Sequence, residues 1–346
     1  MRRRTRLIWG LLLVILAVLA LAPGYFIDWR IYVAGWRLLV GPRARPLTSH
    51  AFETSPVRLQ RGEYLVTGVL ACFRCHSERD WNALGAPALT GKLGAGHEYS
   101  NDGTSTPGLV APNITPDPET GAGKWTDDML ARAIREGIGH DGRALFPGMW
   151  YASFRWLSDE DLASVIVYLR SVPPVYNRLP KTRLTLVNRM AAAYSPEPLT
   201  AQVPSPDLQS LAKRGEYLAK VADCVGCHTD WYHPGSAVNE KHFAGGNSLP
   251  SPRGRVYSAN ITPDASGIGY YDASMFIKVM RTGKVSARQL NAVMPWYWYR
   301  NMSDDDLRAV FAWLCAQSSV KHLVDNTEPP TYCRLCRQSH GGGDRN

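Results

Sequence analysis

The chain has 346 residues, 45% of them hydrophobic and 20% charged, which is the composition of a folded protein rather than a disordered one. The formal net charge is +9, and four of the arginines lie within the first six residues. No lysine- and arginine-rich block is interleaved with aromatic residues, so the sequence excludes a typical nucleic-acid-binding surface.

The first predicted element is a membrane-spanning helix. Residues 7–27 are 21 consecutive positions without a formal charge, which is long enough to cross a bilayer. A cleaved secretory signal is the alternative, because residues 20–22 read Ala-Leu-Ala, the form of a cleavage site. We favour a retained anchor over residues 1–30, since the apolar run continues past that site. The following segment, residues 31–57, is expected to begin with a helix that lies at the membrane surface.

The rest of the chain contains two copies of one pattern, with five landmarks in the same order. The offset between copies falls gradually from 153 residues at the first landmark to 145 at the last, as two related domains with small loop deletions would give. The landmarks are Arg61-Gly-Glu-Tyr-Leu65 and Arg214-Gly-Glu-Tyr-Leu218, Cys72-Phe-Arg-Cys75-His76 and Cys224-Val-Gly-Cys227-His228, Asn113-Ile-Thr-Pro-Asp117 and Asn260-Ile-Thr-Pro-Asp264, Met149 and Met294, and Ser158-Asp-Glu-Asp-Leu162 and Ser303-Asp-Asp-Asp-Leu307. We therefore predict a first repeat over residues 58–175 and a second repeat over residues 211–320, with a proline-rich linker over 176–210 and a tail over 321–346.

Each repeat carries the signals of three helices. The first helix is expected at residues 59–70 and 211–222, and the linker is expected to hold a short helix at 183–194. The second and third helices begin where a short polar residue precedes an apolar-periodic run, and the second ends before a glycine. These boundary residues are Thr126, Gly137 and Ser158 in the first repeat and Asp272, Gly283 and Ser303 in the second. The stretches between the helices are rich in glycine, proline and asparagine and are expected to be loops.

The Cys-x-x-Cys-His sequence at residues 72–76 and 224–228 is the attachment signal of a c-type haem. Two cysteines on one turn reach the two vinyl groups of the porphyrin, and the adjacent histidine points at the iron. A thiol redox pair has no use for that histidine, and a zinc site needs more ligands nearby. We predict two covalently bound haem c groups, attached through Cys72 and Cys75 with His76, and through Cys224 and Cys227 with His228.

The second axial ligand of each iron is predicted to be a methionine. Met149 and Met294 lie in equivalent loops between the second and third helices, from which a thioether can cross the haem face opposite the histidine. Met129 and Met275 also match between the repeats, but they lie one turn into a helix, where packing is the commoner role. Ligation by histidine and methionine raises the reduction potential and leaves no open position on the iron.

These motifs, together with Lys-Trp-Thr-Asp-Asp and Leu-Ser-Asp-Glu-Asp-Leu, resemble the cytochrome c subunits of bacterial membrane-bound dehydrogenases of the alcohol and gluconate type. The resemblance covers residues 58–175 strongly and 211–320 more weakly. It implies an all-α fold of two tandem cytochrome c domains, here behind an N-terminal transmembrane helix, and it implies the same four axial ligands. Those subunits usually carry three haems and a C-terminal anchor, whereas this chain has two haem signals and an N-terminal apolar span.

The function predicted from the sequence is electron transfer from a periplasmic dehydrogenase subunit to a quinone, another cytochrome or a terminal oxidase. Haem is attached to such motifs outside the cytoplasm, so we expect a single-pass inner-membrane protein with its haem domains on the periplasmic side. A dihaem enzyme of the peroxidase or thiosulfate-oxidising type is the alternative, and it would need one open or unusually ligated iron. The remaining cysteines, Cys315, Cys333 and Cys336, are expected to form a disulfide, with a zinc site that includes His340 as the alternative.

Overall fold

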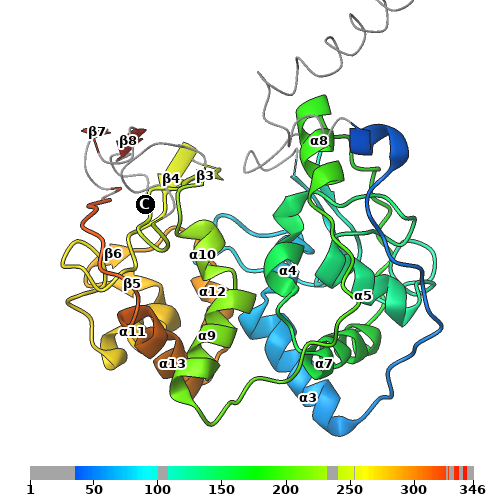
Figure 1. Ribbon diagram of the computed structural model, residues 1–346, viewed down its shortest axis with the longest axis horizontal. Coiled ribbons are helices and arrows are strands. Elements are labelled where there is room, and N and C mark those ends of the chain that lie inside the picture. The colour runs from blue at the N-terminus through cyan, green and yellow to red at the C-terminus, as the bar shows by residue number, and fades with distance from the viewer. Residues whose placement is uncertain are drawn as a thin grey trace, which may run out of the picture.

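The computed structural model describes residues 36–99, 108–231, 241–252, 254–324, 326, 331–334 and 338–340. The two repeats lie side by side in Figure 1, and a long segment that contains α8 (Leu186–Tyr194) connects them. The predicted membrane-spanning helix, residues 7–27, lies outside the described residues. Within the described ranges, no helix is both long enough and apolar enough to cross a bilayer.

Helices form the frame of both repeats, and their main boundaries agree with the capping signals in the sequence. The second and third helices of each repeat begin after a side chain that accepts a hydrogen bond from a backbone amide three residues later, and both second helices end at a glycine with positive φ. The first repeat contains α3 (Pro56–Tyr64), the π-helix η1 (Leu65–Val69), α4 (Cys72–Cys75), α5 (Asp127–Glu136), the 3-10 helix η3 (Pro147–Met149), α6 (Tyr151–Phe154) and α7 (Asp159–Ser171). The second repeat contains α9 (Leu211–Val221), α10 (Cys224–Cys227), α11 (Ala273–Thr282), α12 (Trp296–Tyr299) and α13 (Asp304–Cys315).

The prediction of an all-α fold is wrong, because the described chain also forms four two-stranded antiparallel sheets. Their strands have only two to four residues, which is too short for an alternating pattern to stand out in the sequence, and those within the repeats lie in segments predicted as loops. The pairs are β1 (His97–Glu98) with β2 (Val110–Ala111), β3 (Ser248–Ser251) with β4 (Gly254–Tyr257), β5 (Lys284–Val285) with β6 (Arg288–Gln289), and β7 (Thr331–Cys333) with β8 (Gln338–His340). The fold is therefore a helical frame with small sheets in its connections.

The repeated Arg-Gly-Glu-Tyr-Leu sequence holds the first and third helices of each repeat together. In the first repeat, a Cβ atom on Gly62 would lie 2.0 Å from the backbone oxygen of Ser164, so only glycine allows α3 and α7 to cross at this distance. The preceding residue, Arg61, pairs with Asp161 on α7, with 2.8 Å between Nε and Oδ1. The second repeat has the same two contacts, Gly215 against Ala309 and Arg214 with Asp306.

The tyrosine of that sequence reaches across to the other repeat. Tyr217 donates a hydrogen bond to Asp161 at 2.6 Å and accepts one from the amide of Ser158 at 3.2 Å. Tyr64 makes the reciprocal pair of contacts, to Asp306 and from the amide of Ser303. The interface therefore has the form of a two-fold contact, in which one surface patch is used twice.

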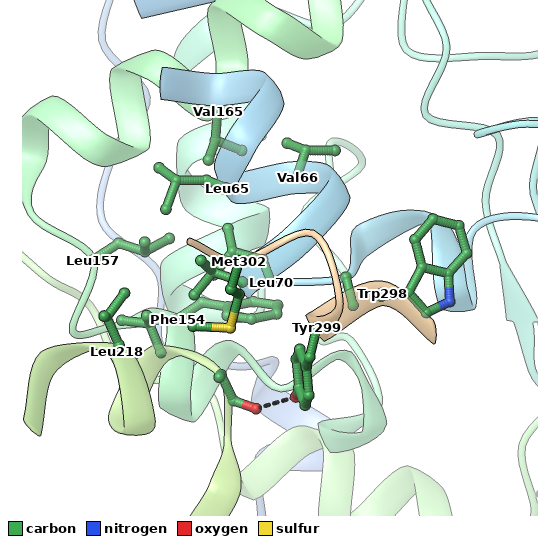
Figure 2. Close-up of a cluster of buried hydrophobic side chains, with 14 of the residues drawn as sticks. Leu65, Val66, Leu70, Phe154, Leu157, Val165, Leu218, Trp298, Tyr299 and Met302 are labelled. Atoms are coloured by element: carbon green, nitrogen blue, oxygen red, sulfur yellow. Dashed lines mark hydrogen bonds between the residues drawn. The ribbon is translucent and has the colours of Figure 1, made fainter. Parts of the chain in front are cut away.

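A single hydrophobic core continues across this interface. Figure 2 shows Leu65, Leu70 and Leu157 of the first repeat gathered with Leu218 and Met302 of the second. Near this cluster, the Tyr299 hydroxyl donates to the backbone oxygen of Ala222 at 2.7 Å. The helix after each predicted methionine ligand packs on the helix before the other repeat's cysteine pair, α6 on α9 and α12 on η1. Each candidate site is therefore flanked by a helix of the other repeat.

Candidate functional site

Each cysteine pair lies on a single helical turn, α4 or α10, that begins after a residue with left-handed backbone conformation. These residues are Ala71, with φ of 49°, and Asp223, with φ of 57°. In both repeats the amide of the following histidine donates to the backbone oxygen of the first cysteine at 3.0 Å, which closes the turn. Two thiols and an imidazole therefore emerge from one compact turn in each repeat.

Both histidines are held through Nδ1 by a backbone oxygen. The Nδ1 atom of His76 lies 2.7 Å from the oxygen of Pro112, and that of His228 lies 2.7 Å from the oxygen of Ala259. Because a carbonyl oxygen can only accept, Nδ1 carries the proton and Nε2 keeps its lone pair for a metal ion. Burial also lowers the pKa of both imidazoles, which favours the neutral form that binds iron.

The loop that supplies this backbone oxygen is fixed by a buried asparagine. Next to Pro112, the side chain of Asn113 accepts hydrogen bonds from the amide and hydroxyl of Thr115 and donates to the oxygen of Val175 at 2.7 Å. In the second repeat, Asn260 makes the same contacts to Thr262 and Val320. Sequence reasoning identified this motif as a landmark but assigned it no role. Its recurrence after each cysteine pair was the available signal.

A cavity lies beside each cysteine turn and brings the predicted residues together. The first cavity has a volume of about 140 Å³ and is lined by Cys72, Cys75, His76 and Met149. The second has a volume of about 420 Å³ and is lined by Cys224, Cys227, His228 and Met294. The other lining residues are mainly apolar, such as Ile114, Leu130 and Phe154 in the first cavity and Ile261, Phe276 and Leu307 in the second. An apolar slot with two thiols, an imidazole and a thioether fits haem c.

The methionines differ in how they relate to these cavities. Met129 and Met275 line neither cavity, which supports the packing role predicted for them. Met280 and Met302 line the second cavity together with Met294, and only Met294 has a methionine counterpart in the first repeat. The assignment of Met149 and Met294 as axial ligands stays a prediction.

Cys72 and the second cysteine pair do not have the character of redox-active thiols. Burial raises the pKa of Cys72, Cys224 and Cys227 to about 12, whereas a dithiol catalyst needs a thiol with a lowered pKa. Among the described residues, no three histidine, cysteine, aspartate or glutamate side chains gather as a metal site. Cys315 is an exposed free thiol at the end of α13, which does not support the predicted disulfide. The side chains of Cys333 and Cys336 lie outside the described residues.

Comparison with known proteins identifies relatives among cytochromes. A protein from Cereibacter sphaeroides named as a dihaem c-type cytochrome is 30% identical over 257 residues, which are 70% of this chain and 80% of the relative. The cytochrome c subunit of a quinone-dependent alcohol dehydrogenase from Gluconobacter oxydans is 41% identical over 106 residues. One of the subunits of a nicotinate dehydrogenase from Pseudomonas putida is 32% identical over 206 residues.

The length of the match separates these relatives. The matched region covers 30% of this chain and 21% of the alcohol dehydrogenase subunit, and 56% of this chain and 16% of the nicotinate dehydrogenase subunit. The chain thus spans less than a third of the length of these two subunits but most of the dihaem protein. No protein-family profile matches the chain.

Proposed function

The chain belongs to the family of dihaem c-type cytochromes and dehydrogenase cytochrome c subunits, and on that premise we propose that it carries single electrons from a periplasmic dehydrogenase through two haem c groups. The acceptor in this proposal is a quinone, another cytochrome or a terminal oxidase. The observation that carries the proposal is the occurrence of two equivalent cavities, each lined by two cysteines, a histidine and a methionine.

The protein's own residues hold and tune the cofactor. Bound haem c supplies an iron that alternates between the ferrous and ferric states. The two cysteines of each turn would form the thioether bonds, and the carbonyl of Pro112 or Ala259 would orient the histidine with Nε2 toward the iron. Met149 or Met294 of the cavity lining would complete the ligand set and raise the reduction potential.

Two methionine ligands favour a carrier over a dihaem enzyme. A peroxidase needs an iron with a position open to its substrate, and Met149 and Met294 would occupy that position in both repeats. The mainly apolar lining of each cavity would also limit the access of water to the iron, which suits electron transfer rather than ligand chemistry.

A dehydrogenase donor is proposed because several relatives are named as cytochrome subunits of alcohol, fructose and gluconate dehydrogenases. A location outside the cytoplasm is proposed because covalent attachment of haem to Cys-x-x-Cys-His sequences takes place there. Both points can be tested by purification of the native protein from its source, with identification of the flavin or quinone enzyme that accompanies it.

The experiment that tests the core of this proposal is a measurement of haem content and ligation in the purified protein. We expect two haems per chain, low-spin spectra in both oxidation states and no reaction with carbon monoxide. The double variants Cys72→Ala/Cys75→Ala and Cys224→Ala/Cys227→Ala should each keep one haem, and Cys315→Ala, as the control, should keep two. One haem per chain in the wild type would refute the dihaem proposal, and a carbon-monoxide-binding haem would support the enzyme instead.

A further inference from the structure

A half-buried arginine from the first cysteine turn connects the two candidate haem sites. Arg74 lies between Phe73 and Cys75 on α4, and its Nη2 atom donates to the backbone oxygen of Val293 at 2.9 Å. Its guanidinium carbon lies 5.2 Å from the centre of the Trp150 ring. Val293 directly precedes Met294, and Trp150 directly follows Met149. One side chain therefore contacts the methionine loops of both sites.

The charge of Arg74 has no ion-pair partner among the described residues. Its Nε atom is buried and makes no hydrogen bond within the part of the chain that the structure describes. The guanidinium stays protonated, because arginine does not lose its proton in proteins. Its guanidinium interacts electrostatically with Cys75 of the first site and Cys227 of the second, and with Asp223 of the second cysteine turn.

The second cysteine turn presents the opposite charge. Asp223 directly precedes Cys224, lines the second cavity and is buried. Its Oδ1 atom accepts a hydrogen bond from Ser153 of the first repeat at 2.5 Å. A Cβ atom on Gly226 would lie 2.3 Å from this carboxylate, so glycine at that position leaves room for the carboxylate above the turn.

The equivalent positions of the two turns therefore differ in charge. Arg74 corresponds to Gly226, and Asp223 corresponds to Ala71, each at the 152-residue offset of the cysteines. Another arginine lies on the wall of each cavity, Arg143 in the first and Arg288 in the second, so these two do not distinguish the sites. The asymmetry between the sites is concentrated at the interface of the repeats.

A nearby positive charge stabilises the reduced iron, which carries one positive charge less than the oxidised iron, and a negative charge stabilises the oxidised iron. Both effects are large in a buried site because the local dielectric constant is low. Arg74 is adjacent to the first site through Cys75, while Asp223 is adjacent to the second site through Cys224. The carboxylate therefore acts mainly on the second site, and the arginine acts mainly on the first.

We propose that the charges of Arg74 and Asp223 set the reduction potential of the first haem above that of the second. This difference would fix the direction of electron transfer within the protein. The proposal rests on the presence of both haems. In the favoured step, one electron leaves the reduced iron at Cys224 and Cys227 and reduces the oxidised iron at Cys72 and Cys75, without transfer of a proton or atom. Electrons therefore enter at the second repeat and leave from the first.

The test is a redox titration of the full-length protein, followed by visible absorption and fitted to two one-electron components. Replacement of a methionine ligand by histidine lowers the potential of its own haem. We therefore expect Met149→His to lower the upper component and Met294→His to lower the lower one, which assigns each component to a site. The opposite assignment overturns the proposal.

Charge variants then test the cause of the separation. Arg74→Gln should move the equilibrium between the two haems at least tenfold toward the second, which corresponds to about 59 mV for a one-electron couple. Arg74→Lys, which keeps the charge, should retain most of the separation, and Asp223→Asn should raise the lower component. Arg308→Gln, on the exposed side of α13, is the matched control and should move neither component.

The outcomes separate this proposal from the one on which it rests. A wild-type protein with fewer than two haems refutes the dihaem function itself. Two haems with an unchanged separation in Arg74→Gln, or equal losses in Arg74→Gln and Arg74→Lys, refute only the role of the charge. If Arg74→Gln fails to retain haem, Asp223→Asn decides, because a lower component that stays in place also overturns the proposal.

Discussion

Asn113 offers the sharpest test of how the loops around the haem sites work. Its side chain is 1% exposed and satisfies the amide and hydroxyl of Thr115 on one side and the oxygen of Val175 on the other. The substitution Asn113→Ala leaves the Thr115 amide and the Val175 oxygen without these partners. The Thr115 amide and hydroxyl are buried and both lose Asn113 as their acceptor, whereas the half-buried Val175 oxygen keeps the Thr115 hydroxyl at 3.4 Å. At about 1–3 kcal/mol for each buried group that loses its partner, we expect a loss of about 3 kcal/mol in the free energy of unfolding.

The assay for this loss is thermal unfolding of the haem-loaded protein, with Asn82→Ala as the control because Asn82 is exposed. A loss of this size should lower the melting temperature by roughly 10 °C, since 1 kcal/mol corresponds to about 2–4 °C for domains of this size. Asn113→Asp should be similarly harmful, because a carboxylate keeps the acceptor for Thr115 but cannot donate to Val175.

A second readout connects the loop to the site. The oxygen of Pro112 orients His76, so movement of this loop should change the reduction potential of the first haem and leave the second unchanged. The reasoning is refuted if Asn113→Ala unfolds within a degree of Asn82→Ala and both haems keep their potentials.

Three further predictions concern the ligands and the helix contacts. Met294→Ala should open the second iron to carbon monoxide and lower the reduction potential of that haem, whereas Met302→Ala should only lower stability. If absorption spectra show carbon monoxide binding in Met302→Ala and not in Met294→Ala, the ligand is Met302. Gly62→Ala should lower the free energy of unfolding by at least about 3 kcal/mol in urea titrations, because its Cβ would meet backbone on α7, and a neutral effect would contradict the close crossing. Tyr217→Phe should cost about 2 kcal/mol in the same titrations, because it removes one donor to the buried Asp161 carboxylate and leaves the buried Ser158 amide without this acceptor. Tyr168→Phe loses no hydrogen bond to the described residues and should cost less, so equal costs would argue against the reciprocal interface.

The helices could be predicted because their signals are local. The side chains at Thr126, Ser158, Asp272 and Ser303 cap the helices that they were expected to cap, since a short polar side chain and an apolar period act within a few residues of chain. The strands were missed for the opposite reason. The segment His97–Glu98 pairs with residues 12 and 14 positions away, and two residues are too few to carry a pattern.

The candidate site was predicted only as far as its motifs extend. The cysteines and histidines share one short sequence, and a repeated methionine in an equivalent loop completes each set. The groups that orient the histidines, and the charged side chains near the cysteine turns, depend on contacts between segments far apart in the sequence. Such contacts leave no local pattern in the sequence. Arg74 meets Val293 from 219 positions away, and Tyr217 meets Asp161 from 56 positions away in the other repeat.

The reciprocal interface explains why a fused pair of repeats differs from a dimer of identical chains. In a symmetric dimer every contact occurs twice, so a charge on one cysteine turn would also be present on the other turn, and two like charges within one interface are unfavourable. Fusion in one chain removes this constraint, because each turn can change independently while the contacts of Tyr64 and Tyr217 stay equivalent. It also makes the interface independent of protein concentration. Arg74 and Asp223 occupy the part of the interface where this freedom matters most, since there a difference in charge becomes a difference between two otherwise equivalent redox sites.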